Sequence, residues 1–150
     1  MLFVQRGICM IFTNSNFGRT LGLIEKGLQV SSLRSRVIGN NIANAETPNF
    51  KRTDINFEAS LKKALDFEFV KDGLMKANKT EPGHFDYPTP LTWDKVQPRA
   101  VLDHLSTVKN NGNNVDIERE TSEAVKNNMT YTMLAELARF QFNQINTVVK

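Results

Sequence analysis

Residues 34–52 read RSRVIGNNIANAETPNFKR, and this stretch ends a long helical pattern. Pro48 lacks a backbone N–H and disfavours helical geometry at the residue before it, so the helix must end before this proline. Asn40, Asn41 and Asn44 lie on one side of the last turns, where their amides can donate to and accept from neighbouring backbones. A cap followed by a loop needs only one asparagine. The whole run therefore indicates a functional helix end.

The segment before this stretch, from about residue 18 to residue 44, lacks proline and repeats apolar residues at helical spacing. A helix of about 27 residues would be roughly 40 Å long at 1.5 Å per residue. One apolar set follows a seven-residue pattern with Ser31 and Ser35 in two intervening core positions, and a second set forms an adjoining stripe. The first set is Leu21, Ile24, Leu28, Ile38, Ile42 and Ala45; the second is Leu23, Val30, Leu33 and Val37.

A second segment at residues 117–149 contains neither proline nor glycine, which predicts another long helix. Asp116 is a good N-cap, and Glu118, Glu120 and Glu123 place negative charge at the positive end of the helix dipole. Two apolar tracks exceed what one seam needs, so we expect one side to face the chain itself and one to face neighbours. The tracks are Ile117, Ala124, Tyr131, Leu134, Ala138, Ile145 and Val148, and Met129, Met133, Leu137 and Phe140.

The predicted fold is mainly α, with long N- and C-terminal helices paired as an antiparallel coiled-coil hairpin. In this arrangement Arg34 and Arg36 would lie near the acidic residues 120–123. The intervening region contains all five prolines and is expected to be irregular and partly mobile. Within it we predict a short helix at 57–70, loop and short strand at 80–93, and a turn at 110–114. The predicted division is an N-terminal extension at 1–17, a discontinuous helical domain at 18–46 and 116–150, and a middle region at 47–115.

The composition gives little support to other classes of function. The net charge is +3, but the basic residues are scattered among acids without interleaved aromatic residues, which argues against nucleic-acid binding. Cys9 is the only cysteine, and His84 and His104 lack metal-ligand spacing. Glu118 and Glu120 point to different faces of a helix and so do not form a catalytic pair. We therefore predict no metal, no cofactor and no enzymatic activity.

The first residues are apolar but are interrupted by Arg6 and Gly7, and no small-residue cleavage site follows. We expect neither a cleavable signal peptide nor a membrane span there. Met1 and Met10 are both possible starts of the native chain.

The motif Asn41-Ile42-Ala43-Asn44-x-x-Thr47-Pro48-x-Phe50-Lys51 resembles the N-terminal signature of flagellar rod and hook proteins at every position. Residues 113–120, followed by a helix with Asn127, Asn128 and Tyr131, resemble the C-terminal region of the proximal-rod branch of that family. Residues 80–85 resemble its middle region. Hook and distal-rod proteins are much longer than this chain of 150 residues, which also favours the proximal branch.

The resemblance implies a structural subunit of the bacterial flagellar rod, exported by the flagellar type III system without a cleaved signal and assembled helically in the periplasmic part of the basal body. The implied partners are other rod proteins, further copies of itself, and the adaptor protein and export gate at the rod base. A non-enzymatic helical-hairpin adaptor or export chaperone is the alternative interpretation. The candidate assembly residues are Leu28, Val37, Asn40, Asn41, Ile42, Ala43, Asn44, Thr47, Pro48, Phe50, Asn114, Val115, Asp116, Tyr131, Leu134, Leu137, Ala138, Phe140 and Ile145.

Overall fold

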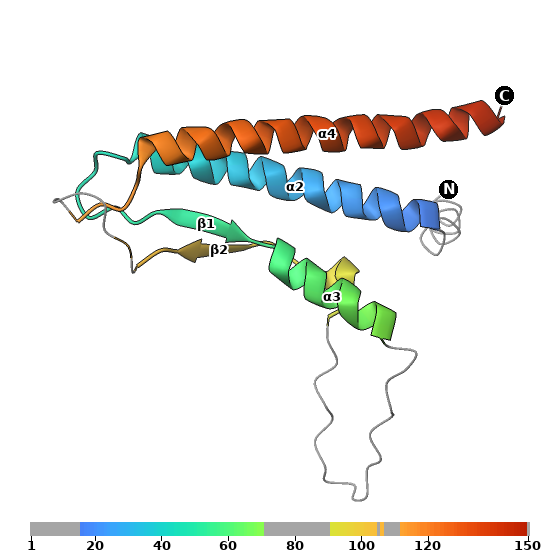
Figure 1. Cartoon of the computed structure of the whole chain (residues 1–150), viewed down its shortest axis with the longest axis horizontal. Helices are drawn as coiled ribbons and strands as arrows, with labels where there is room; N and C mark the ends of the chain where they lie inside the picture. The colour runs from blue at the N-terminus through green and yellow to red at the C-terminus, as the bar shows by residue number, and fades with distance from the viewer. Residues whose placement is uncertain (1–15, 71–90, 105, 107–111, 150) are drawn as a thin grey trace, which may run out of the picture. The chain divides into compact units, whose positions relative to one another are not determined.

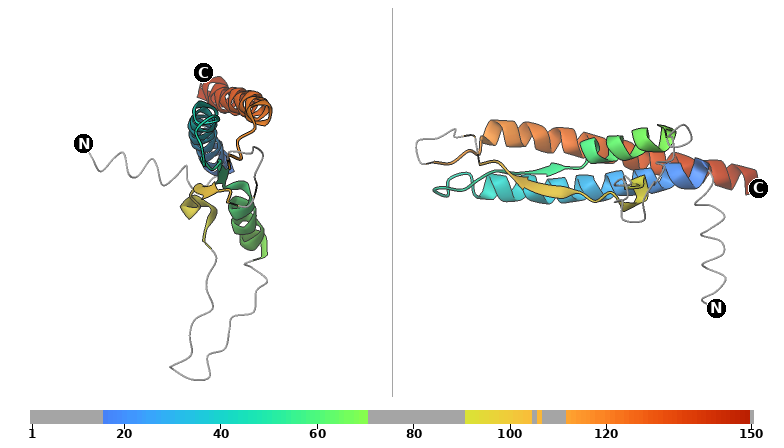
Figure 2. Two further views of the ribbon diagram at one scale, coloured as in Figure 1. Left: turned by 90° about the vertical axis from the view of Figure 1, so that its left-hand side faces the viewer. Right: turned by 90° about the horizontal axis from the view of Figure 1, so that it is seen from below.

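A computed structural model describes residues 16–70, 91–104, 106 and 112–149. Two long helices dominate it: α2 spans Asn16–Ala43 and α4 spans Ile117–Val149. They pack side by side in opposite directions, as Figure 1 and the end-on view in Figure 2 show. The predicted mainly helical fold with an antiparallel hairpin is confirmed. The expectations for residues 1–15 lie outside the described part of the chain.

The described residues divide into two compact units. The first holds both long helices and includes the described residues up to 55 and from 100 onward, whereas the second includes residues 56–70 and 91–99. The chain leaves the first unit within strand β1 (Thr53–Asn56) and returns to it within strand β2 (Arg99–Leu102).

The ends of the two helices follow from local chemistry. The Asn44 N–H still bonds the Asn40 carbonyl at 3.2 Å, but the chain then turns through Thr47 and Pro48. Asn49 adopts a positive φ of 61°, a conformation that asparagine tolerates better than most residues. At the start of α4, Asp116 Oδ1 accepts a hydrogen bond from the Glu118 N–H at 3.0 Å, which confirms the predicted N-cap.

The buried side of α2 differs in part from the predicted one. Ile24, Ser31, Ile38 and Ala45 are buried, as the seven-residue pattern requires, but Ser35 is exposed. Asn41, which lies outside the seven-residue pattern, is buried because β1 lies against its flank of α2 and Thr53 bonds its side chain. The apolar pattern alone gave no sign of this strand.

The middle of the hairpin seam is closely packed and partly polar. A Cβ added at Gly27 would lie 2.9 Å from Leu134 Cδ1, so the two helices approach each other closely at this point. Near it, Asn127 Nδ2 donates to the Ser31 carbonyl at 2.9 Å, whereas Asn127 Oδ1 has no hydrogen-bond partner among the described residues. A buried amide that is only half satisfied costs stability and disfavours alternative registers, in which both its ends would be unpaired.

Strands β1 and β2 form a two-stranded sheet and run antiparallel. Some β structure is expected in the middle region, and this is confirmed, but the sequence does not predict the positions of these two strands because four-residue strands carry little periodicity. The expected loop and strand at 80–93 falls mostly outside the described residues, and Trp93 instead begins a 3-10 helix, η2, at Trp93–Lys95.

The second unit contains α3, which spans Glu58–Val70 and confirms the predicted short helix. Ala64 on α3 and Val96 after η2 are buried, and the two elements contact each other. Phe57, directly before α3, is also buried.

The close approach of Gly27 to Leu134 gives a test of the helix register. Gly27→Ala gains helix propensity of about 1 kcal/mol but crowds the Leu134 side chain. In a Leu134→Ala background that crowding disappears, so the same substitution should stabilise the hairpin. We expect a coupling of at least about 0.5 kcal/mol in a double-mutant cycle measured by urea unfolding. Strictly additive effects would show that these residues do not face each other.

Candidate functional site

The clearest concentration of polar side chains in the first unit lies where the hairpin closes. It consists of Asn41, Arg52, Asn113, Asn114 and Glu120, here called the closed-end cluster. All five residues are buried, although they come from four places: the end of α2, the segment before β1, the segment before α4 and the first turn of α4. Buried polar groups in this number are unfavourable unless they satisfy one another.

The centre of the closed-end cluster is an ion pair between Arg52 and Glu120. The two groups approach to 2.5 Å, the Glu120 side chain is 0% exposed, and the Arg52 side chain is 11% exposed. Burial by itself would lower the pKa of Arg52, but the hydrogen bond and charge of Glu120, together with Asp54, raise this pKa above its ordinary value. The guanidinium therefore stays charged. The second carboxylate oxygen of Glu120 accepts from Asn41 Nδ2 at 3.0 Å, so both oxygens are occupied.

Asn41 and Asn114 use their amides as substitutes for backbone groups. Asn41 accepts from the Thr53 N–H at 3.1 Å and donates to the Thr53 carbonyl at 2.8 Å. Asn114 accepts from the Arg52 N–H at 2.6 Å and donates to the Asp103 carbonyl at 2.7 Å. Each amide thus satisfies one donor and one acceptor of the backbone, and together they hold β1 and the end of β2 against the hairpin.

Asn113 and Gly112 close the other side of the cluster. Asn113 donates to the Ala45 carbonyl at 2.7 Å and accepts from the Val115 N–H at 2.9 Å. Lys51 Nζ donates to the Gly112 carbonyl at 3.0 Å. Gly112 has a φ of +78°, a conformation that favours glycine, and a Cβ there would lie 2.8 Å from Asn49 Oδ1, so a larger residue would be strained and would displace the Asn49 side chain. Gly112, Asn113 and Asn114 thus lie in the predicted 110–114 turn, whose first two residues are outside the described chain.

The structure divides the sequence-predicted assembly residues into three groups. Asn41, Asn114 and Val115 are buried and serve the chain's own fold. Asn40 and Asn44 bond each other through their side chains at 3.1 Å. The half-buried members are Leu28, Val37, Ile42, Asn44, Phe50, Leu134, Ala138 and Ile145. The exposed members are Asn40, Ala43, Thr47, Pro48, Asp116, Tyr131, Leu137 and Phe140.

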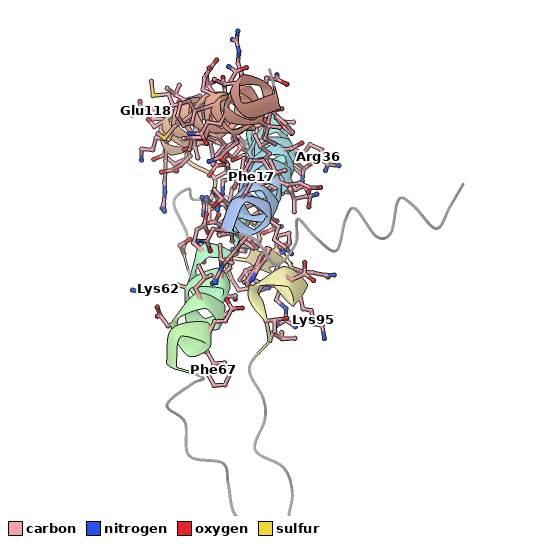
Figure 3. The ribbon with its side chains drawn as sticks, turned by 90° about the vertical axis from the view of Figure 1, so that its right-hand side faces the viewer. Phe17, Arg36, Lys62, Phe67, Lys95 and Glu118 are labelled. Atoms are coloured by element: carbon pink, nitrogen blue, oxygen red, sulfur yellow. The ribbon has the colours of Figure 1, made fainter. Side chains whose placement is uncertain are left out.

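Sequence reasoning missed the central ion pair. Glu120 was assigned to the helix dipole, and Arg34 and Arg36 were expected near residues 120–123. Instead Glu120 pairs with Arg52, and Arg34 Nη2 donates to the Ile55 carbonyl at 3.3 Å. Figure 3 looks along the helices and shows Arg36 and Glu118 projecting to opposite sides of the pair. The sequence offered one clue to the role of Arg52, which is that a basic residue ends the motif stretch at this position.

A second feature is an apolar row on the outside of α4. It consists of Val125, Met129, Met133, Leu137 and Phe140, here called the α4 stripe, and these side chains are 44–67% exposed. Spacings of four and three residues place them on one helix face. A shallow groove lined by Val125, Met129 and Met133 follows the same face. Contiguous exposed apolar surface of this kind is typical of a protein interface.

The described residues show little sign of reactive chemistry. Within them, no group of three or more His, Cys, Asp or Glu side chains is placed to hold a metal ion. Among the described helices, none combines the length and the apolar character needed to cross a membrane. The described residues therefore show two features, a buried polar cluster and an exposed apolar face.

Comparison with known proteins identifies the family. Residues 25–51, which contain the end of α2 and most of the motif stretch, match the family model described as flagella basal body rod protein. The chain is 41% identical over 136 residues to flagellar basal body rod protein FlgB of Borreliella burgdorferi, covering 91% of this chain and 99% of the relative. The chain belongs to the FlgB family of flagellar basal body rod proteins.

Other FlgB proteins match over nearly the same length. Identity is 38% over 135 residues to FlgB of Borrelia hermsii, covering 89% of this chain and 98% of the relative. It is 31% over 135 residues to FlgB of Bacillus subtilis, covering 90% and 96%. The chain therefore has a structural role in the flagellar basal body rod, and the FlgB match includes both long helices and the closed-end cluster.

The central ion pair gives a direct test of the closed-end cluster. Glu120→Ala leaves the buried Arg52 charge without its main partner, which should lower the free energy of unfolding by about 3–5 kcal/mol. Glu118→Ala, an exposed neighbour in the same helix turn, should change it by less than about 1 kcal/mol. Urea unfolding followed by circular dichroism measures both. Equal effects of the two substitutions would show that the buried pair is not formed.

Proposed function

We propose that this chain is a proximal-rod subunit that assembles helically through the α4 stripe and the exposed residues at the end of α2. The observation that carries the proposal is that a member of a rod-protein family leaves five large apolar side chains exposed in a row on its longest helix. Within the described residues, α2 packs on the other side of α4 and leaves this row exposed. A neighbouring subunit can cover it.

The closed-end cluster has a different part in this proposal. It holds the ends of α2 and α4 and the two strands in a fixed arrangement, so that exposed Asn40, Ala43 and Thr47 are presented at a rigid helix end. A rigid contact surface loses less conformational entropy on assembly than a mobile one. The predicted motif therefore acts partly in folding and partly in contact.

The remaining parts of the proposal come from the family. The chain is made in the cytoplasm, exported by the flagellar type III system without a cleaved signal, and placed in the periplasmic section of the basal body. Its partners are other rod proteins, copies of itself, and the adaptor protein and export gate at the rod base. It catalyses no reaction. Packing of one subunit on the next by two different surfaces produces an open helical polymer, which suits a drive shaft.

Substitutions on the α4 stripe test the contact directly. Met133→Glu and Phe140→Glu place charge on an apolar contact face and should abolish rod assembly and swimming. Both side chains are exposed, so the free energy of unfolding of the purified chain should change by less than about 1 kcal/mol. Ala135→Glu is the matched control, since Ala135 is exposed on the opposite flank of α4. Normal motility of both stripe variants would rule out the stripe as an assembly surface.

Deletion of the gene tests the place in the rod. Motors imaged in intact cells should retain the membrane ring but lack rod and hook, and the gene supplied in trans should restore them. Complete rods, hooks and filaments in the deletion strain would contradict the proposal and favour an accessory adaptor or chaperone. Export of other rod proteins, measured in the same strain, separates a chaperone from an adaptor.

A further inference from the structure

The two outer edges of the β1–β2 sheet differ in how their backbone groups are hydrogen-bonded. The outward backbone groups of β1 are bonded by side chains of α2: Asn41 bonds both the N–H and the carbonyl of Thr53, and Arg34 bonds the carbonyl of Ile55. Figure 1 accordingly shows β1 lying between α2 and β2. The β1 edge is closed within the chain.

Within the part of the chain that the structure describes, no hydrogen bond reaches the outer edge of β2. The Asp103 N–H bonds the Arg52 carbonyl at 2.9 Å, which fixes the alternation of the antiparallel ladder. Val101 therefore faces β1, and the backbone groups of Ala100 and Leu102 point outward. All four residues of β2 are exposed, with Val101 at 49% and Leu102 at 52%. An exposed edge with apolar side chains is a template for another strand.

The β2 edge is complementary to itself. If two copies pair antiparallel about Val101, Ala100 of each copy lies opposite Leu102 of the other. Both residues have outward backbone groups, so they form the hydrogen-bonded pairs of a regular ladder. Arg99 then lies opposite Asp103, whose carboxylate also accepts hydrogen bonds from the Ser106 N–H at 3.2 Å and the Ser106 hydroxyl at 2.6 Å. This pairing occurs twice because the arrangement is two-fold symmetric. Val101 meets Val101 at the centre. The backbone hydrogen bonds, the Arg99–Asp103 charge pairs and the Val101 contact are therefore all formed in the same register.

We propose that β2 pairs with β2 of a second copy, giving a four-stranded sheet in the order β1–β2–β2–β1. The contact is short and the buried surface is below that of a stable dimer, so association is weak and grows with concentration. Because both copies use the same surface, the dimer closes and cannot extend into a polymer. The pairing is separate from the α4 stripe and does not depend on the proposed assembly role. It offers unassembled subunits a way to cover an exposed strand edge.

Charge exchange between two variants provides the main test. Arg99→Asp alone places two acids opposite each other at both ends of the paired strands, and Asp103→Arg alone places two bases there. Each variant should self-associate roughly tenfold more weakly than the unmodified chain. In an equimolar mixture every Arg again lies opposite an Asp, so heterodimers should form at the original concentration. Sedimentation velocity on the full chain measures all three samples. A mixture that associates no better than its components would overturn the proposal.

A backbone test uses proline on the outward positions. Ala100→Pro removes an N–H that points away from β1, so the β1–β2 ladder remains intact while two of the four expected intermolecular hydrogen bonds are lost. Self-association should weaken by roughly tenfold, with thermal unfolding unchanged. Met133→Glu on the α4 stripe serves as the comparison and should leave this association unchanged. Association that persists in Ala100→Pro but disappears in Met133→Glu would assign the dimer to the stripe and contradict pairing through β2.

Discussion

The buried ion pair between Arg52 and Glu120 is the interaction on which the rest of this structure depends. It joins the segment that follows α2 to the first turn of α4. In the sequence, these two parts of the chain lie on either side of the second unit. A buried pair contributes little net stability compared with apolar residues, but each member strongly requires the other. Its effect is therefore specificity: α4 starts beside the end of α2, in one register, with β1 alongside. Asn41 reinforces this by bonding both Glu120 and the backbone of β1.

The chain thereby separates its polar and apolar contacts. At the closed end, side-chain amides occupy backbone donors and acceptors that a larger protein would satisfy with further strands. Along the outer face of α4 the opposite holds, because five apolar side chains remain in contact with solvent. Apolar surface is non-directional and suits contacts between subunits, whereas hydrogen-bonded amides require defined geometry and suit the interior of one subunit. The edge of β1 is covered by α2. The edge of β2 is different from both surfaces, because it exposes backbone donors and acceptors together with apolar side chains.

Much of this architecture could be predicted from the sequence. The two proline-free segments, the stop before Pro48, the cap at Asp116 and the short helix after Phe57 all follow from local backbone chemistry. Ser35 was placed in the core because the apolar pattern was extended without knowledge of β1, which instead brings Asn41 into the buried side. The Arg52–Glu120 pair was missed for a related reason. Dipole complementation explains an acidic first turn equally well, and only the path of the chain after Pro48 brings Arg52 to Glu120.

The same geometry changes how the family motif is understood. In Asn41-Ile42-Ala43-Asn44 the residues that carry the resemblance do not share one role, since Asn41 is fully buried and Ala43 is exposed. Loss of Asn41 would leave Glu120 and the Thr53 backbone with unmet hydrogen bonds, so Asn41 acts through the fold of the chain itself. Asn40 and Asn44 bond each other, and the Asn44 side chain also bonds the Asn40 carbonyl, so both amides hold the last turn of the helix. The motif therefore combines two structural positions, because the buried amide of Asn41 fixes the helix end on which the exposed residues lie.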